Sequence, residues 1–239
     1  MAFGASMRPD KTGDDKERVL QRVRERAYDA YEGSGGRTLE EAGAICRRCL
    51  GADGPPSATE PPSKIKELQN RQETALRTWA QASGLILDSE SFQRRWREQG
   101  CAGETEHEIY FDEASGRWFK RNNLSYHLSW ADYFDRVALH GYLFPEAAIK
   151  LEGFVETEEG LKPVVSQPDI PANRGATRRE VESEMRKLGF RRVRGDDYQR
   201  SDGIVVEDLH DENVLLDENG RLAFIDPVIY LQRSAVCVE

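Results

Sequence analysis

Three polar residues near the end of the sequence have the types and the spacing of a metal and phosphate site. They are Asp208, Asn213 and Asp226, within the stretch VVEDLHDENVLLDENGRLAFIDP. Between Asn213 and Asp226 the sequence contains two short apolar runs and a turn of the kind that hairpins prefer. A hairpin of this kind would bring two carboxylates and an amide oxygen to one point. Hard oxygen ligands suit Mg²⁺, so the stretch predicts a magnesium site.

The spacing Asp-x-x-x-x-Asn, followed by a hairpin and a second Asp, resembles the catalytic loop and metal-binding Asp of the protein kinase fold. The resemblance implies that Asp208 orients or deprotonates an acceptor hydroxyl, and that Asn213 and Asp226 hold Mg²⁺ against the phosphates of ATP. The sequence departs from the kinase pattern at Val206-Glu207, in place of His-Arg, and at Pro227-Val228, in place of Phe-Gly. The strings DLHDENVLL and FIDP are most similar to the small kinase-like domains in polyvalent proteins of phages and mobile elements. A purely structural hairpin is the alternative, because DEN and DENG are ordinary turn sequences.

Lys120 is the candidate phosphate-binding cation. It ends a predicted strand as Trp-Phe-Lys and is the only lysine between Lys66 and Lys150. The resemblance implies that this lysine contacts the nucleotide phosphates. It also implies that Gly103 belongs to a reduced phosphate-covering loop. A lysine that is merely solvated at the end of an amphipathic strand is the alternative.

An amphipathic helix predicted over 129–144 carries two acidic residues, Asp132 and Asp135. In kinases an acidic residue on this helix pairs with the strand lysine and orients it. The resemblance therefore gives one of these two residues that role, and Asp135 is the preferred candidate. Two exposed helix charges are the alternative.

The segment 167–171 contains Pro168 and Pro171, which stiffen an extended chain. The resemblance makes this segment the hinge between two lobes. Backbone groups there, at residues such as Gln167 and Asp169, would contact the adenine ring of ATP.

The order of elements predicts an α+β protein, and the resemblance makes it a reduced protein-kinase-like bilobal fold with an antiparallel β small lobe and a truncated C-lobe. Helices are expected over 15–31, 38–50, 63–82, 90–99, 129–144 and 177–188, and strand-turn-strand units over 106–121, 148–166 and 190–206. We expect a disordered tail (1–14), a helical N-terminal region (15–99) and a minimal kinase-like domain (100–239). Within that domain we expect the small lobe over about 100–166, the hinge over about 167–171 and the reduced C-lobe over 172–239. Few residues follow Asp226, so we expect no activation segment and no conventional site for a peptide substrate.

The composition narrows the classes of function. With 239 residues, 32% of them charged and 38% hydrophobic, the chain is expected to be globular and soluble. The net charge of -9 argues against nonspecific nucleic-acid binding as the main function. Neither a membrane-spanning run nor a signal sequence is visible, so we expect a cytoplasmic protein. Cys46-x-x-Cys49 has no second pair and falls in a helical pattern, so we interpret it as two thiols on a helix.

The first functional hypothesis is therefore an ATP- and Mg²⁺-dependent phosphotransferase acting on an unknown protein or small-molecule hydroxyl. A nucleotide-binding pseudokinase or adaptor is the second hypothesis, and a variant of it keeps enzymatic chemistry but transfers AMP instead of phosphate. The third hypothesis is an α+β protein without a ligand. It requires Lys120, Asp208, Asn213 and Asp226 to lie apart in space.

Overall fold

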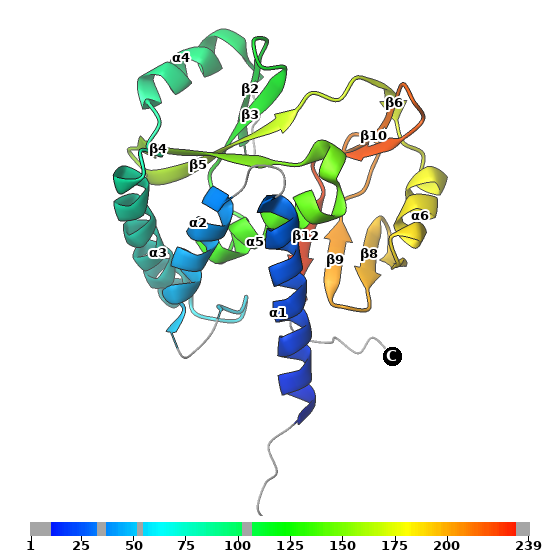
Figure 1. Ribbon diagram of the computed structural model, residues 1–239, viewed down its shortest axis with the longest axis horizontal. Helices are drawn as coiled ribbons and strands as arrows, with labels where there is room; N and C mark the ends of the chain where they lie inside the picture. The colour runs from blue at the N-terminus through cyan, green and yellow to red at the C-terminus, as the bar shows by residue number, and fades with distance from the viewer. Residues whose placement is uncertain (1–10, 33–36, 52–54, 102–106, 233–239) are drawn as a thin grey trace, which may run out of the picture.

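A computed structural model of the chain describes residues 11–32, 37–51, 55–101 and 107–232, which form a mixed α+β fold (Figure 1). Its five-stranded sheet is antiparallel, with the strand order β1-β2-β3-β5-β4. The strands are β1 (Gly100–Cys101), β2 (His107–Asp112), β3 (Arg117–Asn122), β4 (Lys150–Thr157) and β5 (Gly160–Pro168). The hairpins β2–β3 and β4–β5 lie where the alternating apolar pattern predicted them, whereas the two-residue strand β1 had no such signal.

Four helices precede the sheet in the chain. They are α1 (Lys11–Glu32), α2 (Arg37–Arg48), α3 (Pro62–Ala82) and α4 (Ser89–Gln99). Along α3 the buried residues recur at every fourth position, as Leu68, Gln72, Leu76 and Ala80, which is the spacing of one helix face. Helix α1 begins at Lys11, ahead of its predicted start, and the rest of the predicted tail, residues 1–10, lies outside the described residues.

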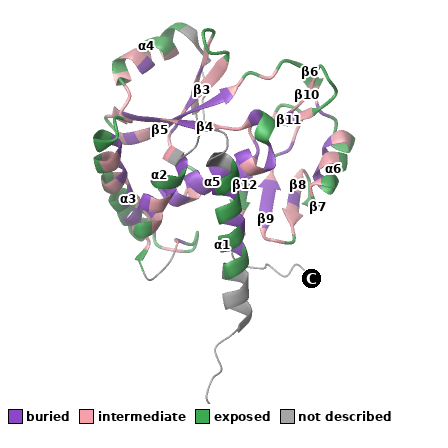
Figure 2. Cartoon of the chain, viewed as in Figure 1, coloured by how far each residue is buried: buried purple, intermediate pink, exposed green. Residues whose placement is uncertain are grey.

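Helix α5 (Trp130–Leu143) is the central element of the fold. It begins after Ser129, whose side chain accepts the Asp132 N–H as an N-cap. Most of its residues are buried, and Figure 2 shows the helix largely in purple between the other elements. Helices α1 and α2 pack against α5, and so does strand β12 (Val228–Leu231). A helix that is buried nearly all round must be covered on every side, so its neighbours fix its position.

The 3₁₀ turn η2 (Pro145–Ala147) lies between α5 and β4 in the chain. Two smaller antiparallel sheets are formed by strands that follow β5. One has the order β11-β10-β6, from strands β6 (Ala172–Gly175), β10 (Val214–Asp217) and β11 (Leu222–Phe224). The other has the order β12-β9-β8-β7, in which β7 (Phe190–Arg194), β8 (Asp197–Arg200) and β9 (Ile204–Glu207) precede the loop of Asp208. Helix α6 (Arg178–Lys187) starts with a capping box between Thr177 and Glu180. Strand β6 was not predicted, because its residues are mostly exposed and show no apolar alternation.

One continuous apolar core joins the N-terminal helices to the sheets. It includes residues of α1, α2, α3 and α5 together with residues of β4, β5, β9 and β12. Phe154 of β4, for example, has its ring near those of Trp79, Trp130 and Phe134. The helices that precede the sheet therefore pack into the same core as the strands. None of the helices in the described ranges is both long and apolar enough to span a bilayer.

Candidate active site

Lys120 and Asp226 meet in the structure. Lys120 lies on β3, opposite Ile109 of β2 and Val165 of β5, and only 9% of its side chain is exposed. Its Nζ lies 3.9 Å from Oδ1 of Asp226, which follows β11. The third hypothesis required Lys120, Asp208, Asn213 and Asp226 to lie apart, and this contact contradicts that requirement for Lys120 and Asp226.

Asp208 and Asn213 also lie together. Nδ2 of Asn213 lies 3.1 Å from Oδ2 of Asp208 and 3.0 Å from the Asp208 carbonyl oxygen, to both of which it donates. Asp208 has a φ of +64°, a left-handed conformation that is uncommon for residues other than glycine. This conformation turns the chain sharply after β9 and allows the two side chains to face each other.

Backbone pairing connects the two halves of the site. The carbonyl oxygen of Asn213 accepts the N–H of Ile225 at 2.9 Å, one residue before Asp226. In addition, Val228 of β12 lies opposite Glu207 of β9, one residue before Asp208. The hairpin β10–β11 and the pair β9–β12 therefore hold Asp226 beside the loop of Asp208, as the hairpin pattern predicted.

A comparison with protein-family models matches residues 69–233 to the family described as serine/threonine/tyrosine kinases found in polyvalent proteins. The chain belongs to this kinase family. It is therefore a kinase-like phosphotransferase in general terms. No match was found among the curated proteins, nor among the solved structures.

Three further residues that contact the candidate site were not predicted from the sequence. Arg136 of α5 places Nη2 3.9 Å from Oδ1 of Asp226 and donates to the Pro227 carbonyl oxygen at 3.2 Å. His210 places Nε2 3.4 Å from Oδ1 of Asp208 and 3.1 Å from Nδ2 of Asn213. The sequence held a partial signal for His210, since it lies inside the Asp-x-x-x-x-Asn spacing, but none for Arg136, whose role depends on how α5 packs.

His140 is the third of these residues. Its Nε2 lies 2.9 Å from the carbonyl oxygen of Phe224, the last residue of β11, and its ring is fully buried. The pKa of His140 is lowered to about 4, chiefly by burial and also by the nearby cations of Lys120 and Arg136, against the opposing effects of the Phe224 carbonyl and Asp226. The imidazole is therefore neutral at physiological pH and links α5 to the strand that leads to Asp226.

The expected pairing of Asp135 with Lys120 is wrong. Both carboxylate oxygens of Asp135 are engaged by the N-terminal helices: Oδ2 by Arg24, and Oδ1 by Tyr28 and Arg47. The physical reason is that Asp135 projects from the face of α5 that packs against α1 and α2.

The side chains of Gln167 and Asp169, in the segment predicted as the hinge, both form hydrogen bonds within the protein. Nε2 of Gln167 is buried and donates to the carbonyl oxygens of Ala147 at 2.8 Å and Ile225 at 2.9 Å. The side chain therefore links β5 to η2 and to the residue before Asp226. Oδ1 of Asp169 accepts the indole N–H of Trp118 at 2.8 Å. These contacts engage the two side chains, whereas the prediction concerned backbone groups at 167–171, and it stays a prediction. Gly103 lies outside the described residues.

The donor set at the site fits a divalent cation. The amide nitrogen of Asn213 contacts Asp208 and His210, whereas its Oδ1 accepts no hydrogen bond from the residues that the structure describes. The carboxylates of Asp208 and Asp226 are partly exposed. Among the described residues no group of three His, Cys, Asp or Glu side chains forms a metal site of its own. Mg²⁺ is commonly bound by one or two carboxylates plus substrate phosphates, so this set suits a cation that arrives with a nucleotide.

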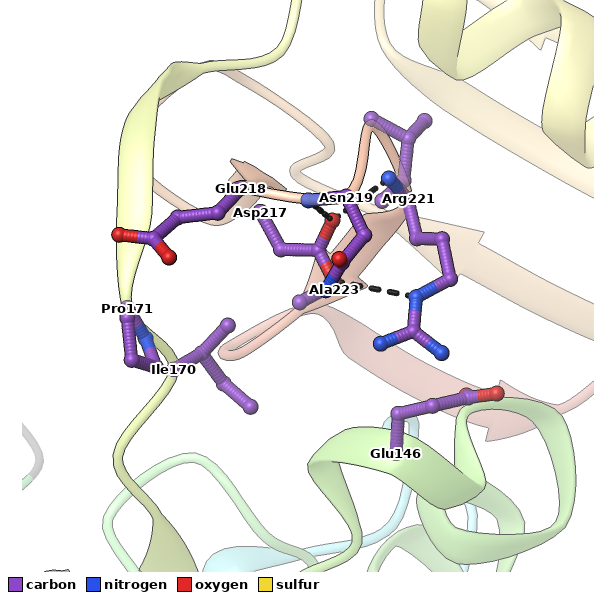
Figure 3. Close-up of a pocket in the computed structure, with 9 residues that line it drawn as sticks. Glu146, Ile170, Pro171, Asp217, Glu218, Asn219, Arg221 and Ala223 are labelled. Atoms are coloured by element: carbon purple, nitrogen blue, oxygen red, sulfur yellow. Dashed lines mark hydrogen bonds and ion pairs between the residues drawn. The ribbon is translucent and has the colours of Figure 1, made fainter.

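Two cavities are lined by none of the four predicted site residues, although Arg136 lines the larger one. A cavity of about 250 Å³ lies between η2, the predicted hinge and the turn of β10–β11, lined by Glu146, Ile170 and Asp217 among others (Figure 3). A larger one, about 760 Å³, lies between α1, α5 and β12. Neither is lined by Lys120, Asp208, Asn213 or Asp226.

Proposed function

We propose that the chain is an ATP- and Mg²⁺-dependent phosphotransferase that acts on a hydroxyl group of a protein or a small molecule. The contact between Lys120 and Asp226, beside the pair of Asp208 and Asn213, is the observation that carries the proposal. An ammonium, two carboxylates and an amide oxygen are the groups that phosphoryl transfer requires. In this proposal the five-stranded sheet is the small lobe, and the elements from β6 onward form a reduced large lobe.

In the proposed reaction the acceptor oxygen forms a bond to the γ-phosphorus of ATP, while the bond from that phosphorus to the β–γ bridging oxygen breaks. Asp208 takes the acceptor proton, and ADP leaves with the electron pair of the broken bond. Lys120 neutralises charge on the phosphate oxygens. A divalent cation held by Asn213 and Asp226 would neutralise further phosphate charge. Positioning and electrostatic stabilisation supply most of the rate, since the protein itself forms no covalent bond.

Asp226→Asn tests the proposal, because it removes a metal-binding charge with little change in shape. ATP turnover should fall on the order of 10²–10³-fold, and calorimetry should show weaker binding of ATP in the presence of Mg²⁺. Asp202→Asn is the matched control, since Asp202 pairs with Arg200 in a turn outside the site. Full turnover in the Asp226 variant would overturn the assignment.

Arg136 favours a second candidate, in which the site binds nucleotide without phosphoryl transfer or moves AMP. With Lys120 it gives Asp226 two cationic neighbours, each at 3.9 Å, so phosphates could bind in more than one register. Attack at the α-phosphorus would release pyrophosphate instead of ADP. Product analysis of the wild-type protein with ATP separates the cases: ADP supports phosphoryl transfer, pyrophosphate supports AMP transfer, and binding without either product supports a pseudokinase.

A further inference from the structure

Asp135 is a covered carboxylate whose partners come from two other helices. Only 11% of its side chain is exposed, and Nε of Arg24 in α1 lies 2.7 Å from its Oδ2. Tyr28 of α1 donates its hydroxyl to Oδ1 at 3.0 Å, and Nη1 of Arg47 in α2 also lies 3.0 Å from Oδ1. Burial, together with the Asp135 carboxylate, raises the pKa of Tyr28, so its hydroxyl stays a donor.

These three donors lie outside the part of the chain that matches the kinase family. The match covers 69–233, whereas α1 and α2 end before it begins. Asp135 lies inside the match. A covered carboxylate is strongly destabilising without its partners, so this kinase domain depends on the preceding helices for one of its own charges.

The next residue on the same helix contacts the active site. Arg136 donates to the Pro227 carbonyl oxygen and lies near Asp226, and one turn later His140 contacts the Phe224 carbonyl oxygen. Successive helix residues project about 100° apart, so α5 presents Asp135 to α1 and α2 and Arg136 to the site. A rotation or shift of α5 would therefore move Arg136 and His140 relative to Asp226.

We propose that Asp135 is a positioning residue, through which α1 and α2 hold α5 so that Arg136 and His140 keep Asp226 in place. The inference rests on the proposed function, because it assigns the N-terminal helices a role in binding ATP and Mg²⁺. Asp135 itself touches neither the reacting groups nor Lys120. Its two oxygens are occupied by Arg24, Tyr28 and Arg47.

Gly43 of α2 gives an independent way to disturb the same contact. A Cβ added there would lie 2.5 Å from the Tyr28 hydroxyl oxygen and 3.0 Å from Nη1 of Arg47. Alanine is a better helix former than glycine, so Gly43→Ala favours the helix itself while it displaces the two donors. No charge is removed in this variant.

The test is a graded series in the full chain: Tyr28→Phe, Arg47→Gln, Gly43→Ala and Arg24→Gln. The dissociation constant for ATP with Mg²⁺, measured by calorimetry, should rise about twofold for Tyr28→Phe and about tenfold for Arg24→Gln, the range of a mutation that acts through packed neighbours. Hydrogen exchange of backbone amides in 222–231 should become faster in the same order. Arg186→Gln, which breaks an exposed pair with Glu182 on α6, is the matched control and should change neither quantity.

The outcomes separate this inference from a purely structural role. If the series lowers the melting temperature while nucleotide affinity and exchange in 222–231 match the wild type at temperatures where the variants are folded, Asp135 is only structural and the inference fails. Should Arg24→Gln fail to fold, Tyr28→Phe and Gly43→Ala decide the question. A wild-type chain that neither binds nor turns over ATP refutes the proposed function instead. Exchange in 222–231 still reports in that case whether α1 is coupled to the strand after Asp226.

Discussion

Lys120 and Asp226 join two parts of the fold, since the lysine lies on β3 in the middle of the five-stranded sheet and the aspartate follows β11. The lysine is covered, whereas 38% of the Asp226 side chain is exposed. Arg136 lies equally near the same carboxylate oxygen. The two cations offset the charge of the Asp226 carboxylate and can also attract the negative charge of a phosphate.

Lys120→Met should lower kcat/KM for ATP on the order of 10²–10³-fold, because it removes a preorganised cation from the developing charge and keeps a side chain of similar length. Steady-state turnover at several ATP concentrations measures the change. Lys162→Met is the control, since Lys162 is a largely covered lysine of β5 that pairs with Glu159. Equal effects of the two substitutions would contradict a phosphate-binding role for Lys120.

Asp208 allows charge and backbone conformation to be tested separately. Asparagine tolerates a φ of +64° better than alanine does. Both Asp208→Asn and Asp208→Ala should lower turnover on the order of 10²–10⁴-fold, because each removes the proposed base. The free energy of unfolding should fall by about 1 kcal/mol more in the alanine variant. Chemical denaturation measures that difference, and an Asn variant with wild-type turnover would exclude Asp208 as the base.

Local patterns explain why much of this site was visible in the sequence. Asp208, Asn213 and Asp226 lie on one hairpin and its flanks, where alternating apolar residues and a turn determine the geometry. The contact between Lys120 and Asp226 is not local, and only the order of elements in the kinase resemblance indicated it. Their juxtaposition is present in the structure, while their chemical roles stay predictions.

The residues that the sequence did not place correctly depend on packing. Asp135 pairs with Arg24 and Arg47, which lie far earlier in the chain, and no periodicity relates a helix charge to a particular distant partner. No local pattern indicated the partners of the Gln167 side chain, which are two backbone carbonyl groups that come together only when β5, η2 and β11 assemble. The predicted helix boundaries lie closer to the observed ones, because capping residues and apolar spacing are local signals.

Gly175 of β6 should be needed for the loop of Asp208. A Cβ at this position would lie 2.7 Å from Cβ of Asp211 and 2.9 Å from its carbonyl carbon. Gly175→Ala should therefore displace the loop and lower kcat about 10²-fold, as misplacement of catalytic groups does. Gly84→Ala provides the comparison: its φ of +68° makes alanine costly, but no atom lies within 4 Å of the added carbon. The prediction fails if kcat is the same in both variants.

Gln167→Leu should lower the free energy of unfolding by about 1–3 kcal/mol, because it leaves the buried Ala147 carbonyl and the half-buried Ile225 carbonyl without this donor. One of these belongs to Ile225, next to Asp226, so turnover should fall as well. Urea denaturation and ATP turnover measure the two effects. Gln199→Leu is the control, since it removes only a half-buried contact with Gln232. Wild-type stability in the Gln167 variant would show that the link does not hold the site.

His140 should make the protein less stable in mild acid. The folded-state pKa is about 4, below the ordinary value of 6.5, because the ring is buried and has Lys120 and Arg136 nearby. Between these two values the unfolded chain binds the extra proton and the folded chain does not, so the free energy of unfolding rises with pH across this window.

The contribution of His140 to the free energy of unfolding is therefore complete above pH 6.5. It is lost as the pH falls toward 4, by roughly 3 kcal/mol in total. Urea denaturation at pH values between 4.5 and 7 measures the slope, which His140→Gln should reduce. The carboxylate of Glu180, whose pKa is lowered from 4.5 to about 2 chiefly by its hydrogen bond with Arg174, adds a slope of the same sign near the acid end of this window, and the His140 variant separates the two contributions. An unchanged slope in the His140 variant would mean that folding does not lower the pKa of the ring. That result would contradict a desolvated imidazole that stays neutral while it contacts the Phe224 carbonyl oxygen.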